Sequence, residues 1–352
     1  MNVTDIAKHV NVEAFVKDLT QSMTSTAVEA LLQKLPIVDE HSYQFSEDDA
    51  ARGWKEGYLH WVPIGRKRGN AGQISLAKRP INPLAERLIN GMEAIIEMMR
   101  QRELLLEPTA SPPISPREAV QRYFKLPSLD QIPLGDKQLR ARARDLARSL
   151  TLQLKWENKA KEFSVVIRDQ GMGQTPIQMH KTLLSLGSSD KGDKPYLIGV
   201  FGQGGSSTYA ASRYSWILSR RAKDLLQGEA DGVGFSIVKH IIPRGRRDHY
   251  FAYLAAHPDG RVPSLPATAA QSIGLEHGSW FAHVAYDFGQ SGAAITRGLY
   301  QALNHVLYNP VLPFDTNIAG TGATIYGNGY RLSNVPQERK DLDKIFDPQP
   351  IS

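Results

Sequence analysis

A series of β-rich runs in the second half of the chain constrains the fold more than any other feature. These runs alternate in polarity or are rich in β-branched and aromatic residues, as strands of a sheet are. They lie at 150–156, 163–169, 214–221, 232–242, 249–256 and 278–288. The polar segment 157–162 predicts a hairpin between the first two, and the second ends at Asp169 in a glycine-containing loop. The sequence therefore predicts a sizeable sheet.

A long helix is predicted ahead of these strands. Over residues 82–106 the apolar side chains recur at helical spacing, so one face should be buried. A proline-rich break follows at 108–116, where Ser115, Pro116 and Glu118 have the pattern of another helix start. A further basic helix is predicted over 136–150, with Arg140, Arg144 and Arg148 at four-residue steps. A solvated helix face is one interpretation of these arginines, and a partner contact is the other.

Composition limits the classes of function. The chain of 352 residues has 41% hydrophobic side chains and no cysteine, which permits a large core and excludes disulfides and thiolate metal sites. The ten histidines show no metal-ligand spacing, so any metal ion is expected to arrive with a ligand. No apolar run approaches the ~20 residues of a membrane span, and the start lacks a secretory-signal layout, so we predict a cytoplasmic location. The formal charge of +6 is compatible with a nucleotide or nucleic-acid partner.

The first motif with chemical potential lies on the long helix. Glu86, Asn90 and Glu93 stand at positions i, i+4 and i+7, so they project from nearly one face. A carboxylate can deprotonate a water, while a carboxamide oxygen one turn away can bind a Mg²⁺ ion held by a triphosphate. A simple polar helix face is the alternative.

A second motif follows the predicted strand 163–169. Asp169 at its end, with Gly171 and Gly173, gives an acceptor for an exocyclic amine beside a backbone that a ligand can approach closely. The alternative is an ordinary turn.

The third motif is a Ser, Gly and Lys segment that runs from about residue 183 to 212. Its glycines, followed by small residues able to start a helix, can form a phosphate cradle or a closing lid. They are Gly199, Gly202, Gly204 and Gly205. The alternative is a flexible loop whose glycines only permit turning.

The order and spacing of these three motifs resemble the N-box and the two glycine motifs of GHKL ATPases, which include gyrase, heat-shock chaperone, histidine-kinase and MutL ATPase domains. The resemblance covers residues 84–212 and extends weakly to 278–286, where Gly278-Ser279 stands in place of a common Gly-Thr. The segment 187–191 is most similar to the MORC and MutL branches. The resemblance to GHKL ATPases implies a Bergerat-type α/β two-layer sandwich. Such a fold has a mixed, mostly antiparallel sheet with helices on one face, and the nucleotide lies between the helices and the sheet.

The resemblance also implies roles for single residues. Glu86 would be the general base, Asn90 the Mg²⁺ ligand and Asp169 the acceptor for the adenine amine. The other implied binding residues are Gly171, Gly173, Lys191, Gly199, Gly202, Gly204, Gly205 and Ser279. Departures from the family pattern are Gln170, Glu93 and the apparent insertion at about 101–150.

The resemblance gives the remaining parts of the chain expected roles. Residues 1–81 form an N-terminal extension, with ATP-dependent homodimerisation as a hypothesis, and residues 82–292 form the ATP-binding domain. Residues 293–352 hold a predicted helix and hairpin, with the start of a transducer-like domain as a hypothesis.

The expected activity is Mg²⁺-dependent ATP hydrolysis, which drives a switch or clamp acting on DNA. A chaperone-like ATPase acting on protein clients and a non-hydrolysing nucleotide sensor are the alternatives. A histidine-kinase catalytic domain is disfavoured, because no helix with a candidate phospho-acceptor histidine precedes the first motif.

Overall fold

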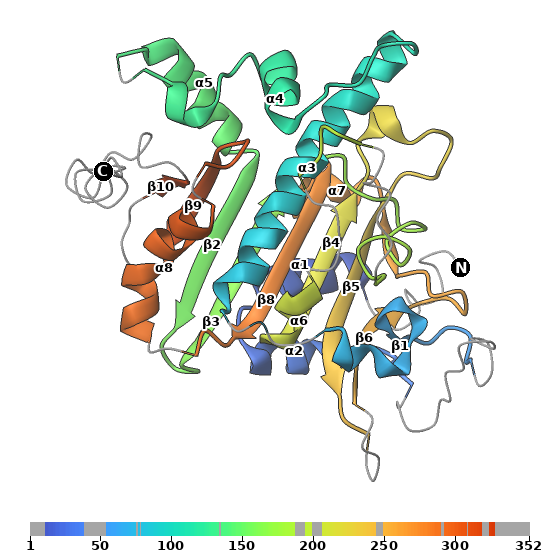
Figure 1. The fold of residues 1–352 in the computed structure, drawn as a ribbon. Coiled ribbons are helices and arrows are strands. Elements are labelled where there is room, and N and C mark those ends of the chain that lie inside the picture. The colour runs from blue at the N-terminus through green and yellow to red at the C-terminus, as the bar shows by residue number, and fades with distance from the viewer. Residues whose placement is uncertain are drawn as a thin grey trace.

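A mixed sheet lies at the centre of the molecule (Figure 1). The computed structural model describes residues 11–38, 54–74, 77, 79–133, 135–186, 194–198, 206–243, 249–289, 292–307, 309–318 and 324–327. Strands follow one another in the order β1-β6-β5-β4-β8-β3-β2-β9-β10, with the short β7 paired to β5. Neighbouring strands are antiparallel apart from β2 and β9, which are parallel. The chain is therefore an α/β protein with a mixed, mostly antiparallel open sheet.

The β-rich runs of the sequence are confirmed as strands of this sheet. The strands are β1 (His60–Pro63), β2 (Leu150–Glu157), β3 (Glu162–Asp169), β4 (Ser212–Arg220), β5 (Gly232–Ile241), β6 (Tyr250–Ala255), β7 (Ser264–Pro266), β8 (Gly278–Tyr286), β9 (Phe314–Ile318) and β10 (Thr324–Gly327). β2 and β3 form the predicted hairpin, with Leu150 opposite Asp169. Short 3-10 helices lie at Ile64–Arg66, Arg68–Gly72, Leu129–Gln131 and Lys223–Leu225.

The predicted long helix is confirmed as α3 (Ile81–Leu106), which lies across one face of the sheet, here called the α3 face (Figure 1). Its buried residues Leu88, Met92 and Ile96 pack in one cluster with Val165 and Ile167 of β3. α6 (Ser207–Ala210) precedes β4, and α8 (Gly292–Val306) packs beside α3. The core under α3 therefore joins α3 and β3 to the C-terminal helix α8.

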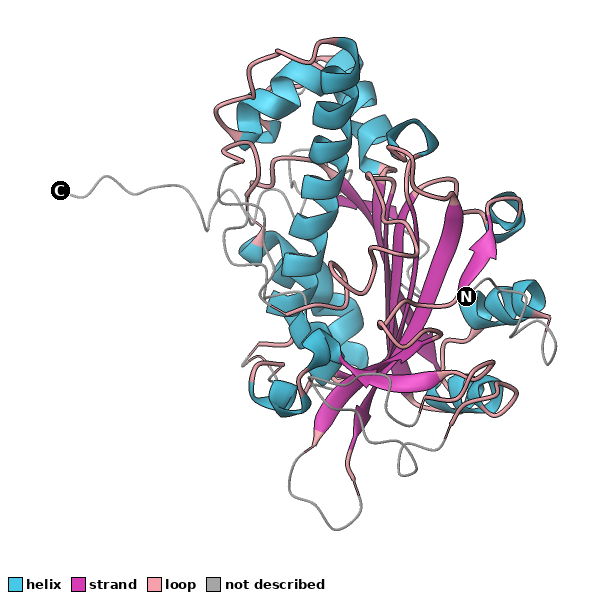
Figure 2. Cartoon of the chain, turned by 90° about the vertical axis from the view of Figure 1, so that its right-hand side faces the viewer, coloured by secondary structure: helices cyan, strands magenta, loops and turns pink. Residues whose placement is uncertain are grey.

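The opposite side of the sheet, here called the back face, is also covered (Figure 2). α1 (Val12–Gln21), α2 (Ser25–Leu32) and α7 (Ala269–Ile273) lie there. Leu19 and Val28 pack with Val166 of β3, whose neighbours along the strand face α3. The expectation of helices on one face was therefore wrong. The physical reason can be seen in β6, where every residue is buried. A strand whose side chains are buried on both faces of a sheet needs a covering layer on each face.

The start of α2 is hydrogen-bonded to Glu162, the first residue of β3. The backbone N–H of Ser25 donates to Glu162 Oε2 over 2.8 Å, and the Ser25 hydroxyl donates to Glu162 Oε1 over 2.6 Å. Residues 1–10 lie outside the described residues. Because α1 and α2 bury their apolar sides on the chain's own sheet, the described part of the N-terminal extension stabilises this sheet. Homodimerisation stays a prediction.

The C-terminal helix and the first part of the hairpin join the same sheet and core. Leu299 and Leu303 of α8 belong to the cluster under α3, β9 pairs with β2, and β10 pairs with β9. The rest of the predicted hairpin, after Gly327, lies outside the described residues. The division of the chain into domains stays a prediction.

The segment 101–150 forms a rim beyond one end of the sheet (Figure 1). It contains α4 (Pro116–Phe124) and α5 (Lys137–Ala147). Ser115 caps α4 by accepting the Glu118 N–H over 3.2 Å, as its sequence predicts. Glu103 near the end of α3 pairs with Arg100 and Arg122 and accepts the Tyr123 hydroxyl, which anchors the rim on α3. Among the described helices none has the length and apolar character to cross a membrane.

Candidate functional site

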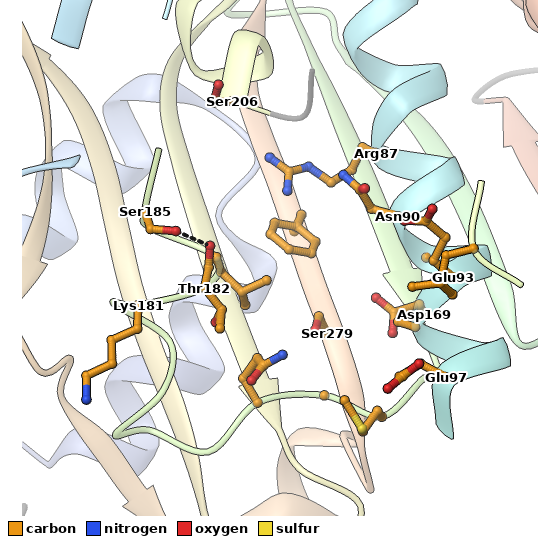
Figure 3. Close-up of a pocket in the computed structure, with 18 of the residues that line it drawn as sticks. Arg87, Asn90, Glu93, Glu97, Asp169, Lys181, Thr182, Ser185, Ser206 and Ser279 are labelled. Atoms are coloured by element: carbon orange, nitrogen blue, oxygen red, sulfur yellow. Dashed lines mark hydrogen bonds between the residues drawn. The ribbon is translucent and has the colours of Figure 1, made fainter. Parts of the chain in front are cut away.

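A cavity of about 320 Å³ lies between α3 and the sheet (Figure 3). Its walls come from α3, the loop after β3, the segments around 181–185 and 194–197, Ser206 and strand β8. The lining residues are Arg87, Asn90, Gly91, Glu93, Ala94, Glu97, Asp169, Met172, Gly173, Gln174, Lys181, Thr182, Leu183, Ser185, Lys194, Leu197, Ser206, Ser279 and Phe281. This volume lies at the lower end of the range for small-molecule sites.

One stripe of α3 forms a wall of the cavity. Arg87, Asn90, Ala94 and Glu97 recur at three- and four-residue steps and line it, so they share one side of the helix. The apolar residues between them face the core. The Asn90 carboxamide and the Glu97 carboxylate lie on the α3 side of the cavity in Figure 3. The helix therefore supplies both an amide and charged groups to the cavity.

Asp169 ends β3 directly beneath this wall. Its side chain is 4% exposed and lines the cavity, and its backbone pairs with Ser279 of β8. Burial raises the pKa of the Asp169 carboxyl to about 7, against the backbone N–H groups of Gly171 and Ser279 and the charge of Arg87, which lower it. Gly171 donates to Asp169 Oδ1 over 2.9 Å. An amine donor from a ligand would find a buried, oriented acceptor here.

Ser279 extends the polar floor of the cavity beside Asp169. The Ser279 and Ser219 hydroxyls lie 3.0 Å apart, and Ser219 also accepts the backbone N–H of Gln174 over 2.9 Å. The loop after β3 is thereby attached to β4 and β8. Asp169 and Ser279 form a fixed pair of polar groups, which suits recognition of a planar ligand edge.

The two glycines after Asp169 are required by close packing. A Cβ at Gly171 would lie 2.6 Å from the backbone carbon of Ala94, so any larger residue would push the loop away from α3. Gly173 has a φ of +65°, and a Cβ there would lie 1.9 Å from the Arg220 carbonyl oxygen. The glycines of this motif thus hold the loop between α3 and β4.

Two carboxylates of α3 hold the segment 194–198 against the helix. Glu93 Oε1 accepts the backbone N–H of Ile198 over 2.8 Å. Glu97 Oε1 lies 2.9 Å from Lys194 Nζ. Both acids are almost fully buried. Glu93 and Glu97 therefore position the chain that borders the cavity.

The structure brings together some of the sequence-predicted residues. Asn90, Asp169, Gly173 and Ser279 line the cavity, and Gly171 supports its edge. Glu86 is half-buried on α3, one turn before Asn90, and it is not among the described residues that line the cavity. Five predicted residues lie outside the described residues: Lys191, Gly199, Gly202, Gly204 and Gly205.

Sequence reasoning missed two charged residues of α3 that line the cavity, Arg87 and Glu97, and also Lys181 and Lys194 from the segments around 181–185 and 194–197. A signal for the two α3 residues was present, because they stand three residues before and seven residues after Asn90, which is the spacing of one helix side. Within the described ranges no group of three or more His, Asp or Glu residues could hold a metal ion. Asn90 offers an amide oxygen to the cavity, which fits an ion that is held mainly by a ligand's phosphates.

Comparison with known proteins yields no match to a family model and none to a curated protein.

Proposed function

We propose that this chain binds ATP with Mg²⁺ in the cavity and hydrolyses it, as an ATPase of the GHKL type. The observation that carries the proposal is convergence. Asn90, Asp169 and Ser279 come from separate parts of the sequence. Asn90 and Asp169 were selected from two different motifs and Ser279 from the family resemblance, yet all three line one cavity. A helix face that is merely solvated, or a loop that merely turns, gives no reason for them to meet.

The adenine end of the proposed site is the Asp169 and Ser279 pair. The buried Asp169 carboxylate would accept a hydrogen bond from the exocyclic amine, with the Ser279 hydroxyl beside it. This pairing would favour the charged form of Asp169. Guanine presents a carbonyl oxygen in place of the adenine amine, so the same carboxylate would repel it.

The reacting end would lie farther toward the start of α3. Asn90 would bind the Mg²⁺ ion, which neutralises charge on the phosphates when it is bound. Glu86, one turn earlier on the same helix, would deprotonate the water that attacks the γ-phosphate. The fold proposed for this arrangement is a Bergerat-type layer of α3 and sheet, to which α1, α2 and α7 add a layer on the back face.

The proposal is tested by calorimetric titration with a non-hydrolysable ATP analogue and Mg²⁺, accompanied by phosphate-release kinetics with ATP. We expect saturable binding that weakens in Asp169→Asn and persists in Glu86→Ala, whose turnover is lost. A wild-type protein that binds neither the analogue nor ADP contradicts the proposal. Binding with no measurable phosphate release reduces the protein to a nucleotide sensor.

A switch or clamp acting on DNA is the proposed biological use of the hydrolysis. The feature that supports it is α5 in the rim, where Arg142 is exposed on a helix that contains further arginines and the exposed Arg148 caps the end of that helix. ATPase assays with and without DNA, over a series of salt concentrations, test this use. Phosphate-dominated binding weakens steeply with salt. Stimulation by an unfolded protein client, with none by DNA, would instead favour the chaperone-like alternative.

A further inference from the structure

A buried cation lines the cavity next to the residue proposed as the base. Arg87 follows Glu86 on α3, is 6% exposed, and lies among the cavity residues. In Figure 3 its guanidinium group extends from α3 across the cavity in the direction of Ser206. An arginine stays protonated at all ordinary pH values, so this wall carries a permanent positive charge.

Three contacts, from the two elements α6 and β8, fix the position of the guanidinium group. Nη2 of Arg87 donates to Thr208 Oγ1 of α6 over 3.2 Å. The guanidinium carbon lies 4.2 Å from the ring centroid of Phe281 on β8 and 5.6 Å from that of Tyr209. Stacking on an aromatic face holds the planar group without using its hydrogen-bond donors. The group is therefore oriented before a ligand enters.

The acidic side chains and the Arg87 guanidinium group lie at different ends of the cavity, and one of the acids, Glu97, is paired with Lys194. Asp169 and Glu97 lie together near Ser279 in Figure 3, while the Arg87 guanidinium lies at the other end, toward Ser206. Hydroxyl groups of Thr182, Ser185 and Ser206 line the cavity as well. A ligand that matches this arrangement has amine donors at one end and an anionic group at the other.

We infer that Arg87 binds a phosphoryl group of the ligand, which makes it the residue that selects phosphorylated ligands over the bare nucleoside. This inference rests on the proposed function and adds a contact to the same site. Arginine presents parallel N–H donors that match phosphate oxygens, and such charge-assisted hydrogen bonds are among the strongest in proteins. A fixed guanidinium loses little freedom when the phosphate binds.

The test compares ligands that share the base but differ in charge. Adenosine, ADP, a non-hydrolysable ATP analogue and inorganic tripolyphosphate are titrated into wild type, Arg87→Gln and Arg87→Lys. Arg100→Gln is the matched control, because Arg100 is equally buried on the same helix and hydrogen-bonded to Glu103, but it does not line the cavity. Circular dichroism checks that each variant is folded.

We expect Arg87→Gln to weaken binding of the ATP analogue and of tripolyphosphate by roughly 10- to 100-fold, with adenosine unaffected. Arg87→Lys should recover part of the loss, since it restores the charge without the planar fork. Arg100→Gln should leave all four affinities unchanged.

Other outcomes separate this inference from the proposed function. Equal weakening of adenosine and of the ATP analogue in Arg87→Gln, or equal effects of Arg87→Gln and Arg100→Gln, would show that Arg87 only packs, and would overturn the inference alone. Arg87-dependent binding of tripolyphosphate, without binding of any adenine compound, would support the phosphoryl contact and reject the ATPase proposal. No binding of any probe to wild type would reject both.

Discussion

The two faces of strand β8 are built from alternate residues and have different chemistry. Phe281 faces the cavity together with Ser279, and His283 follows on the same side of the strand. On the other side, Ala282 and Val284 belong to the apolar cluster of the back face, with Trp280 packed against it. One strand therefore separates a polar cavity from an apolar layer.

Buried charged side chains are also distributed unequally between the α3 face and the back face. Among the described residues, the buried Asp, Glu and Arg side chains are on α3 or at the end of β3. They are Arg87, Glu93, Glu97, Arg100 and Asp169. Burying a charged group is costly, and a site that binds or reacts is a common reason for it. The back face therefore has an apolar core without buried Asp, Glu or Arg among the described residues, while the α3 face combines an apolar core with charges that are held in place.

The strongest test of this division is Glu86→Ala on the α3 face. A general base contributes about 10²- to 10⁴-fold to a rate, so turnover should fall by that factor while the thermal midpoint and the ATP-analogue affinity stay near the wild-type values. Phosphate-release kinetics measure the change. Glu107→Ala, at the exposed end of the same helix, is the control. Full turnover in Glu86→Ala would remove Glu86 from the chemistry.

Leu19→Ala tests the back face. Leu19 is fully buried in α1 against the sheet, and truncation of such a leucine costs about 2–5 kcal/mol of unfolding free energy. Denaturant unfolding should show this loss. Nucleotide affinity of the folded protein should not change, because α1 lies on the side of the sheet away from the cavity. A variant with normal stability but impaired binding would break the division between the faces.

Asp169→Asn should act on binding. An amide cannot serve the adenine amine as well as a carboxylate, so the affinity for the ATP analogue should fall by about 1–3 kcal/mol, as titration calorimetry would show. Asp145→Asn is the control, since the Asp145 side chain is exposed on α5. An Asp169→Asn protein that binds as tightly as wild type contradicts the proposed adenine contact.

The raised pKa of Asp169 predicts that the stability of the ligand-free protein changes with pH, and Asp169→Asn tests this prediction. The pKa of Asp169 is raised from 3.8 to about 7 by burial, so the unfolded chain releases this proton at a lower pH than the folded chain does. This group therefore destabilises the fold increasingly as the pH rises from about 4 to 7, with little further change above 7. The stability of Asp169→Asn relative to wild type should rise across this window. Thermal melts at a series of pH values would show it, and a constant difference would contradict the raised pKa.

The smallest effect is expected in the rim. Replacement of Arg140, Arg144 and Arg148 by Ala should leave basal turnover near the wild-type rate. Arg140 and Arg144 lie on α5 and Arg148 caps its end, and none of the three lines the cavity. If DNA binds there, its affinity and the salt dependence of its binding should both decrease. Loss of basal turnover in a folded triple variant would show that the rim takes part in catalysis.

Local patterns were sufficient to predict most elements of this chain. Helical spacing located α3, and the β-rich runs located the strands around Asp169. The covered back face was missed, although β6 is a run of apolar and aromatic residues too continuous for a strand with one solvent-facing side. The parallel pairing of β2 with β9 joins residues about 160 positions apart, and no local signal specifies such a contact.

Only some residues of the site were predicted, because local patterns show residue type and spacing but not tertiary packing. Asn90 and Asp169 were found because their residue types stand out in a recognisable spacing. Arg87 was missed because an arginine on a helix usually reaches solvent, and only the packing of Phe281 and Thr208 shows that this one is buried in the cavity. Sequence spacing places Arg87 on the same side of the helix as Asn90, but it does not show that this side lines a cavity.

The length of α3 links the cavity and the rim mechanically. At 1.5 Å per residue its 26 residues extend for about 39 Å, with Arg87 and Asn90 in its first half and Glu103 near its end. Glu103 attaches α4 of the rim to the helix through Arg122 and Tyr123. A partner that binds α4 and displaces it would therefore change the tilt of α3, the helix that forms a wall of the cavity. By thermodynamic linkage, a ligand that shifts α3 would change the affinity of the rim for this partner by the same factor by which the partner changes the affinity of the cavity for the ligand.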